Sequence, residues 1–106
     1  MFEVQMIIPL ADNDGESFGP ELFASYEATA VELLGGFTLY PASVLGGWRD
    51  GAGRDVRDSS RVYAFAIGSI AQGGAVVALA RFSCALFRQD AIFIRYLGLA
   101  EIILPA

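Results

Sequence analysis

The chain has 106 residues and a net charge of −5, its seven basic residues are all arginine, and it contains no histidine. This length is typical of one domain, and we expect residues 1–106 to form it. Hydrophobic residues make up 55% of the chain and charged residues 18%, against about 45–50% and about 25% in typical domains. The apolar excess predicts that another subunit covers part of the surface, and the acidic total disfavours nucleic-acid binding.

The residue types also limit the chemistry. Without histidine the chain lacks the commonest metal ligand and the commonest general base, so we expect no metal and no cofactor. Cys84 is the only cysteine, which excludes a disulfide within the chain. The first residues, MFEVQMIIPL, contain no basic segment of the kind that opens a signal peptide, and we expect a cytoplasmic location.

Hydrophobic periodicity predicts four strands and two helices. Residues 2–10 alternate apolar and polar positions, as in a half-buried strand. A helix is expected to begin at Gly19-Pro20-Glu21, where proline suits the first turn, and to end at Gly35-Gly36. The remaining elements are an edge strand at 37–45, which contains Pro41, a strand at 61–67, a helix at about 73–89 and a strand at 91–100.

Residues 62–80 carry no charge, and a run of this length could span a bilayer. Its centre, GSIAQGG at residues 68–74, contains three glycines, a serine and a glutamine. This interruption favours a strand, a turn and the start of a helix, so we expect no membrane contact.

The order strand, helix, strand, strand, helix, strand predicts an α+β fold of the ferredoxin-like βαββαβ type. Its antiparallel sheet carries both helices on one face. In the strands at 61–67 and 91–100 neither face is polar, so a second copy of the chain is expected to cover the open sheet face. The residues expected at that contact are Val62, Ala64, Ala66, Phe93 and Leu97.

Two places are candidate ligand-binding positions. Trp48, the only tryptophan, stands beside Arg49 at a strand end and could stack on a flat ligand or anchor a partner. Alternatively, Trp48 covers a neighbouring core, and the Arg/Asp alternation that follows is the solvated end of a hairpin turning at DGAG, residues 50–53.

Arg95 is the other candidate, because a charge inside an apolar strand needs a partner. We expect it to pair across the sheet with Glu3 or Gln5, as a structural contact at a subunit interface. Alternatively it binds a small anion in a cavity between sheets, near Tyr63 or Tyr96. The residues assigned to ligand binding are Trp48, Arg49, Tyr63, Arg95 and Tyr96, and no catalytic residue is assigned.

The segment GGFTLYPASVLGGWRDGAGRDVRDSSRVYAF resembles a group of small bacterial domains of unassigned function, which share the pattern G-x-W-R-D-x-x-G between two strands. The later segment FSCALFRQDAIFIRYL is similar to their F-x-Q-[DE]-[AS]-[VI] close. The resemblance covers about residues 33–97 and rests on Trp48, Arg49, Asp50, Phe87, Gln89 and Asp90. It implies a ferredoxin-like fold, with distant fold-level likeness to PII-like signalling proteins and dimeric α+β barrel enzymes.

Three hypotheses of function follow. The first is an oligomeric, PII-like ligand-binding or regulatory domain that holds a nucleotide or other small anion at a subunit cleft and contacts a partner through residues 41–61. The second is a small-molecule enzyme of the dimeric α+β barrel type, such as a cofactor-free monooxygenase or isomerase. The third is a purely structural interaction module.

Overall fold

The computed structural model describes residues 1–99 and 105 of the chain. Its elements, in chain order, are β1 (Phe2–Pro9), α1 (Pro20–Leu34), β2 (Thr38–Leu39), β3 (Val44–Arg49), β4 (Asp55–Ile67), the short 3₁₀ helix η1 (Ile70–Gln72), α2 (Gly73–Leu86) and β5 (Phe93–Leu99).

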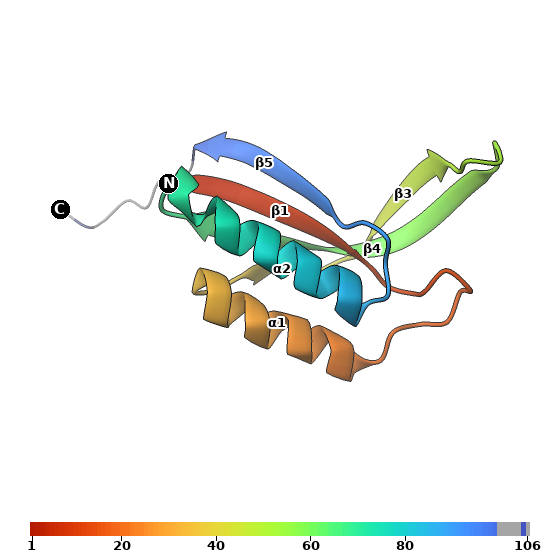
Figure 1. Ribbon diagram of the computed structural model, residues 1–106, viewed down its shortest axis with the longest axis horizontal. Helices are drawn as coiled ribbons and strands as arrows, with labels where there is room; N and C mark the ends of the chain where they lie inside the picture. The colour runs from red at the N-terminus through yellow and green to blue at the C-terminus, as the bar shows by residue number, and fades with distance from the viewer. Residues whose placement is uncertain (100–104, 106) are drawn as a thin grey trace.

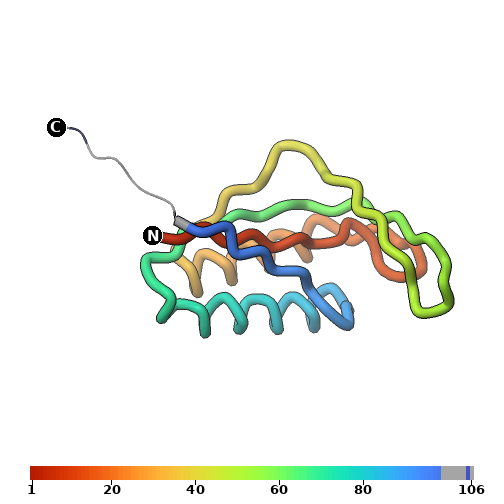
Figure 2. The backbone as a smooth tube through the Cα atoms, turned by 90° about the horizontal axis from the view of Figure 1, so that it is seen from above, coloured from red at the N-terminus to blue at the C-terminus, as the bar shows by residue number. Residues whose placement is uncertain are grey.

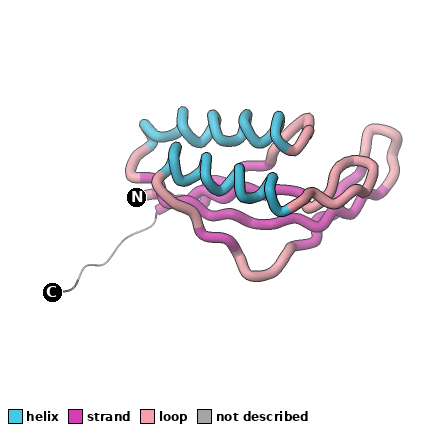
Figure 3. The backbone as a smooth tube through the Cα atoms, turned by 90° about the horizontal axis from the view of Figure 1, so that it is seen from below, coloured by secondary structure: helices cyan, strands magenta, loops and turns pink. Residues whose placement is uncertain are grey.

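The strands form one antiparallel sheet in the order β2-β4-β1-β5, and β3 pairs with the first half of β4 beyond the end of β2. Both helices lie against one face of this sheet (Figures 1 and 3). The predicted ferredoxin-like α+β fold is therefore confirmed. Uncharged residues 62–80 form the end of β4, η1 and the start of α2, and no helix in the described part of the chain is long and apolar enough to cross a membrane.

The ends of α1 follow from its sequence. Pro20 opens the helix in a position where its missing N–H costs nothing. At the other end Gly35 adopts a left-handed conformation with φ 85°, and its N–H donates to the carbonyl of Val31. A residue with a Cβ would be strained there, so the glycine fixes where the helix stops.

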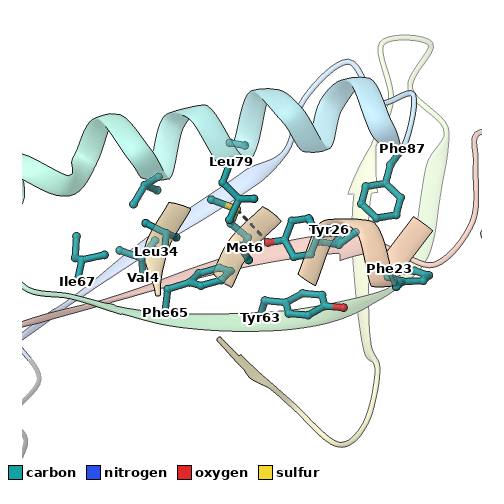
Figure 4. Packing of buried hydrophobic residues seen from close by; sticks show 14 residues of the cluster. Val4, Met6, Phe23, Tyr26, Leu34, Tyr63, Phe65, Ile67, Leu79 and Phe87 are labelled. Carbon is teal, nitrogen blue, oxygen red and sulfur yellow. Dashed lines mark hydrogen bonds between the residues drawn. The ribbon is translucent and has the colours of Figure 1, made fainter. Parts of the chain in front are cut away.

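The core lies between the helices and the covered face of β1 and β4 (Figure 4). Alternation along β1 sends every second side chain into it, and Phe87, just beyond α2, contacts the rings of Phe18, Phe23 and Tyr26. Side chains this large and this well packed supply most of the hydrophobic stabilisation. The largest fully buried ones are Tyr26, Tyr63, Phe65, Phe87, Met6, Ile8, Leu79, Val4 and Val76.

The structure differs from the expected elements in the middle of the chain. The single strand predicted at 37–45 is divided into β2 and β3, because Pro41 has no N–H to continue a ladder. The strand predicted at 61–67 begins earlier, at Asp55, since its first half pairs with β3. The last strand is β5, Phe93–Leu99, and the end predicted for it at residue 100 lies outside the described residues.

Candidate functional site

The strand register assigns side chains to the two faces of the sheet. Because paired residues share a face, Gln5, Ala64 and Arg95 lie together on the face turned away from the helices. We call this side the open face. Its other members in the register are Glu3, Ile7, Val62, Ala66 and Phe93, whereas Leu97, which was expected on this face, falls at a bulge where the register gives it no partner.

The middle of the open face is covered by the chain itself. The connection between β2 and β3 bulges from the sheet on the side opposite the helices (Figures 2 and 3). From its start, Tyr40 reaches across β4, and its hydroxyl accepts a hydrogen bond of 2.7 Å from the side-chain amide of Gln5. Val62 and Ala64, expected at a subunit contact, are consequently buried within one chain. The exposed part of the face shifts to Ala66 and Phe93.

Arg95 lies opposite Gln5 in the register, as expected for neighbouring strands, but it does not pair with Glu3. Glu3 is opposite Gly98, because a bulge after it shifts the register, and no ion pair among residues 1–99 includes Arg95. Of the two expected partners, Gln5 therefore lies opposite Arg95 as predicted, whereas the ion pair with Glu3 is not formed within residues 1–99. The guanidinium lies instead 5.6 Å from the ring centre of Phe93, on an exposed surface.

Trp48 and Arg49 lie on a hairpin that projects from the sheet, residues 44–60, which we call the hairpin arm (Figure 1). All six residues of β3 are exposed, and Trp48 keeps 56% of its surface accessible. Its indole N–H donates a hydrogen bond of 2.7 Å to the carboxylate of Asp58. Arg49 forms an ion pair of 3.3 Å with Asp55.

The side chains of Trp48 and Arg49 point to opposite sides of the arm, because successive residues of a strand alternate between its faces. Trp48 shares its side with Val44, Gly46 and Asp58, and this side continues the open face. A shallow hollow of about 400 Å³ lies on the arm. It is lined by residues of both faces of its strands, Leu45, Gly46, Gly47, Trp48, Arg49, Asp55, Val56 and Arg57. The hairpin turn itself is ordered by Asp50, whose carboxylate accepts the N–H groups of Ala52 and Arg54.

Tyr63 lies in the core on the covered side of β4 and is fully buried. Its hydroxyl donates a hydrogen bond of 2.6 Å to Glu27 and accepts a longer one from Arg61, whose guanidinium also stacks on the ring of Phe23. Burial, together with the bond to the Glu27 carboxylate, raises the pKa of Tyr63 to about 12. This neutral, enclosed phenol supports the fold and has no surface to offer a ligand.

Tyr96 lies on the covered side of β5, opposite Val4, but 60% of its surface is exposed. It borders a second hollow of about 360 Å³, at the end of the sheet where α2 begins (Figure 1). The walls are mostly apolar, and Ile70 on the rim is 82% exposed. The hollow is lined by Phe2, Glu3, Ile67, Ile70, Gly73, Tyr96 and Gly98.

The five residues assigned to ligand binding therefore do not form one site. Trp48 and Arg49 lie on opposite sides of the hairpin arm, and Tyr63 lies in the core. Arg95 lies on the open face, and Tyr96 lies beside the apolar hollow.

Sequence reasoning missed the neighbours of Tyr96 in that hollow, which include Phe2, Ile70 and Gly73. The one available signal was the apolar Ile70 in a predicted turn, where an exposed apolar side chain has no role in a core.

The described residues offer no group of three or more cysteine, aspartate or glutamate side chains that could hold a metal ion. They do offer one apolar hollow with an exposed aromatic ring and one exposed, mixed apolar and charged face. The hollow fits a small flat molecule, and the face fits a macromolecular contact.

No family model matches the chain, and no curated protein matches it. Solved structures match it at the level of fold. A phage SAM lyase in complex with S-methyl-5′-thioadenosine has a TM-score of 0.72 and 15% identity, and the match covers 92% of this chain and 80% of that one. The divalent cation tolerance protein Cut A1 from Thermus thermophilus has a TM-score of 0.66 and 17% identity, with 96% and 86% covered. At these identities the likeness establishes a shared fold.

Proposed function

We propose that the protein is a non-enzymatic, homo-oligomeric domain that binds a small molecule of the nucleotide class at a cleft between subunits. The observation that carries the proposal is the hollow bordered by Tyr96, which combines an exposed aromatic ring with apolar walls. Its volume of about 360 Å³ lies within the range of about 300–1,000 Å³ that ligand pockets occupy. A flat base would stack on the Tyr96 ring and exclude water from Ile67 and Ile70.

The start of α2 supports a ligand with an anionic end. No side chain caps the helix where it begins at Gly73, and the N–H of Gly73 itself donates to the carbonyl of Ile70 in the preceding turn, so an anion would bind the amides that follow Gly73. Space beside Gly73 and Gly74 is open, because an added Cβ would meet nothing within 4 Å at either position. A phosphate or carboxylate group would lie there, next to the positive end of the helix dipole, while the base occupies the hollow.

The open face and the hairpin arm support the oligomer. Phe93 and Trp48 are exposed apolar side chains on the same side of the sheet, beyond the part that the connection between β2 and β3 covers, which is unusual for a surface that meets only water. β5 also has a free edge at the same end of the molecule as the hollow. A second copy against the free edge of β5 would border the hollow beside Tyr96 and supply its remaining wall.

Calorimetric titration with adenosine 5′-monophosphate, S-methyl-5′-thioadenosine and inorganic phosphate tests the proposal. At least one nucleoside compound should bind, and Tyr96→Ala should weaken it by the roughly 5- to 150-fold that corresponds to about 1–3 kcal/mol of base stacking. The matched control is Val77→Ala, an exposed apolar position on α2 outside the hollow, which should leave affinity unchanged. Absence of binding by the whole panel, or equal affinity in Tyr96→Ala, would contradict it.

A second candidate is an enzyme that acts on a sulfonium nucleoside. The observation in its favour is the likeness to the phage SAM lyase, whose solved structure holds a thionucleoside. Glu3 and Tyr96 are the ionisable residues that line the hollow and would have to provide any acid–base chemistry. Incubation with S-adenosylmethionine, followed by chromatography for S-methyl-5′-thioadenosine, separates the candidates. Product formation that is lost in Tyr96→Ala would favour the enzyme over the binding domain.

A further inference from the structure

β3 contains two adjacent glycines that the single chain does not require. Neither Gly46 nor Gly47 has a positive φ. An added Cβ would meet only the Asp58 carbonyl at 3.9 Å or the Val56 carbonyl at 4.0 Å, both ordinary contacts. Glycine weakens a strand, and where no bulge or turn requires it, glycine marks a place where another group approaches closely. The space above both glycines is left open by the described chain, so a group from outside it can enter there.

Gly46 leaves a notch on the side of the arm that continues the open face. Val44 and Trp48 stand two residues away on either side of Gly46 and share its face. Asp58 lies directly opposite Gly46, and its carboxylate holds the Trp48 indole N–H at 2.7 Å. An added side chain at Gly46 has room, and the positions on either side of it on this face are Val44 and Trp48, with the Asp58 carboxylate opposite.

The complementary shape and charge occur on β5. Phe93 projects from the open face with 57% of its surface exposed, and Arg95 follows it two residues later on the same face. The guanidinium lies 5.6 Å from the Phe93 ring centre, so the ring and the positive charge form one compact unit. None of the ion pairs formed within residues 1–99 uses Arg95, although guanidinium groups at interfaces prefer carboxylate partners.

The two features cannot meet within one chain. β4 and β1 separate β3 from β5 in the sheet, and adjacent strands lie about 4.8 Å apart. The arm also extends away from β5, as Figure 1 shows. Phe93 and Arg95 are two residues apart along β5, about 6.6 Å, whereas Gly46 and Asp58 are opposite each other on strands about 4.8 Å apart. A long arginine side chain bridges the difference.

We propose that Phe93 of one copy fills the notch at Gly46 of a second copy, and that Arg95 of the first pairs with Asp58 of the second. This inference rests on the oligomer of the proposed function and names the surfaces that form it. Each copy carries both halves of the contact, so the contact repeats until the assembly closes. Trp48 forms one wall of the notch and becomes buried, which accounts for an exposed tryptophan on a polar arm.

Two glycine variants test the contact. Gly46→Val fills the notch, whereas Gly47→Val adds the same side chain to the opposite side of the strand and serves as the matched control. Both should fold, because the added Cβ has room and valine favours strands. Gly46→Val should raise the dissociation constant of the oligomer by roughly tenfold or more, as expected when an interface core is overfilled, and Gly47→Val should leave it unchanged.

Charge reversal tests the ion pair. Arg95→Asp and Asp58→Arg should each weaken association by roughly tenfold or more, because each places like charges together. The double variant that carries both changes should regain most of the lost affinity, and Arg57→Asp, on the other side of the arm, should have no effect.

The results separate this inference from the proposed function. One outcome is that the parent protein forms an oligomer whose dissociation constant Gly46→Val and Arg95→Asp leave unchanged. That result would contradict the proposed contact at Gly46 and leave the proposed function intact. Failure of the double variant to recover would overturn the ion pair. A parent that is monomeric throughout would overturn both the contact and the oligomer on which it rests.

Discussion

The body of the protein and its hairpin arm are stabilised in different ways. In the body, α1 and α2 pack on β1 and on the second half of β4, where Met6, Tyr63 and Phe65 are almost completely buried. In the arm, all six residues of β3 are exposed, and order comes from the ladder with β4, two ion pairs and the turn at Asp50. Exposed ion pairs contribute little, and an isolated two-stranded hairpin is marginal in water.

This contrast separates two kinds of constraint on the sequence. Burial within the chain accounts for the residue types of the body. The arm keeps a tryptophan, two strand glycines and a leucine in water, and the single chain gains no stability from them. The proposed contact with a second copy would account for these residues of the arm.

The largest difference between the two regions should appear on truncation of an aromatic side chain. Phe87→Ala removes a ring that contacts three others in the core and should cost about 3–5 kcal/mol of unfolding free energy. Trp48→Ala removes a larger side chain from the arm but should cost a monomer about 1 kcal/mol or less, since more than half of it is exposed. Urea denaturation, at a protein concentration low enough to keep the variants monomeric, gives the unfolding free energy of each variant. Similar losses of unfolding free energy in the two variants would show that the body and the arm are not stabilised differently.

A second difference should appear at high pH, in the body alone. Folding raises the pKa of Tyr63 from its ordinary value of 10.0 to about 12, so the protonated phenol is favoured by the folded state. The resulting stability is fully present below pH 10.0 and is lost as the pH rises towards about 12. The loss should amount to about 2–3 kcal/mol.

Tyr63→Phe should remove this part of the pH dependence and leave the part due to Tyr26, whose pKa burial also raises. Unfolding free energies of parent and variant between pH 9 and pH 12, roughly the range over which phenols titrate, provide the measurement. Parallel curves for the two proteins would show that Tyr63 is not held neutral by the fold.

The sequence predicted the body better than the arm, because burial within the chain determines the residue types of the body and not those of the arm. Alternation along β1 and the glycine that ends α1 are local signals, so their elements were correct to within a residue. Pro41 was recognised as an edge residue, but its division of the strand depends on the tertiary bulge that carries Tyr40 over β4. The burial of Val62 and Ala64 on the open face was therefore not predictable from their own strand.

The candidate site was less accessible to sequence reasoning. Trp48 and Arg49 are neighbours in sequence but point to opposite sides, which alternation predicts once the strand is known to include them. The pairing of Arg95 with Glu3 failed because the register places Gln5, and not Glu3, directly opposite Arg95, and a strand register cannot be read from composition. The hollow beside Tyr96 joins β1, β5 and α2, which no local pattern connects.

A smaller effect is expected where the chain covers its own open face. Tyr40→Phe removes the hydroxyl that accepts the hydrogen bond from the Gln5 side chain, and should cost about 1–2 kcal/mol because the amide of Gln5 is left buried and unpaired. Tyr96→Phe is the matched control, since its exposed hydroxyl can bond to water. Thermal denaturation compares the melting temperatures of the two variants. A melting temperature of Tyr40→Phe equal to that of the parent would show that the bulge does not cover the face.

The smallest effect should come from the arm's own ion pairs. Arg49→Ala breaks the 3.3 Å pair with Asp55, in which both side chains are more than two-thirds exposed, and should change monomer stability by about 1 kcal/mol or less. The free energy of unfolding in urea, with Arg57→Ala as the control on the same side of the arm, measures the change. A loss above roughly 2 kcal/mol would mean that the arm is stabilised from within.

The central claim is that another copy of the chain covers the open face and the hairpin arm. Sedimentation velocity of the parent protein at micromolar concentration tests it most directly. We expect a species of at least twice the chain mass of 11.3 kDa that dissociates on dilution. A single 11.3 kDa species across the whole concentration range would contradict the account.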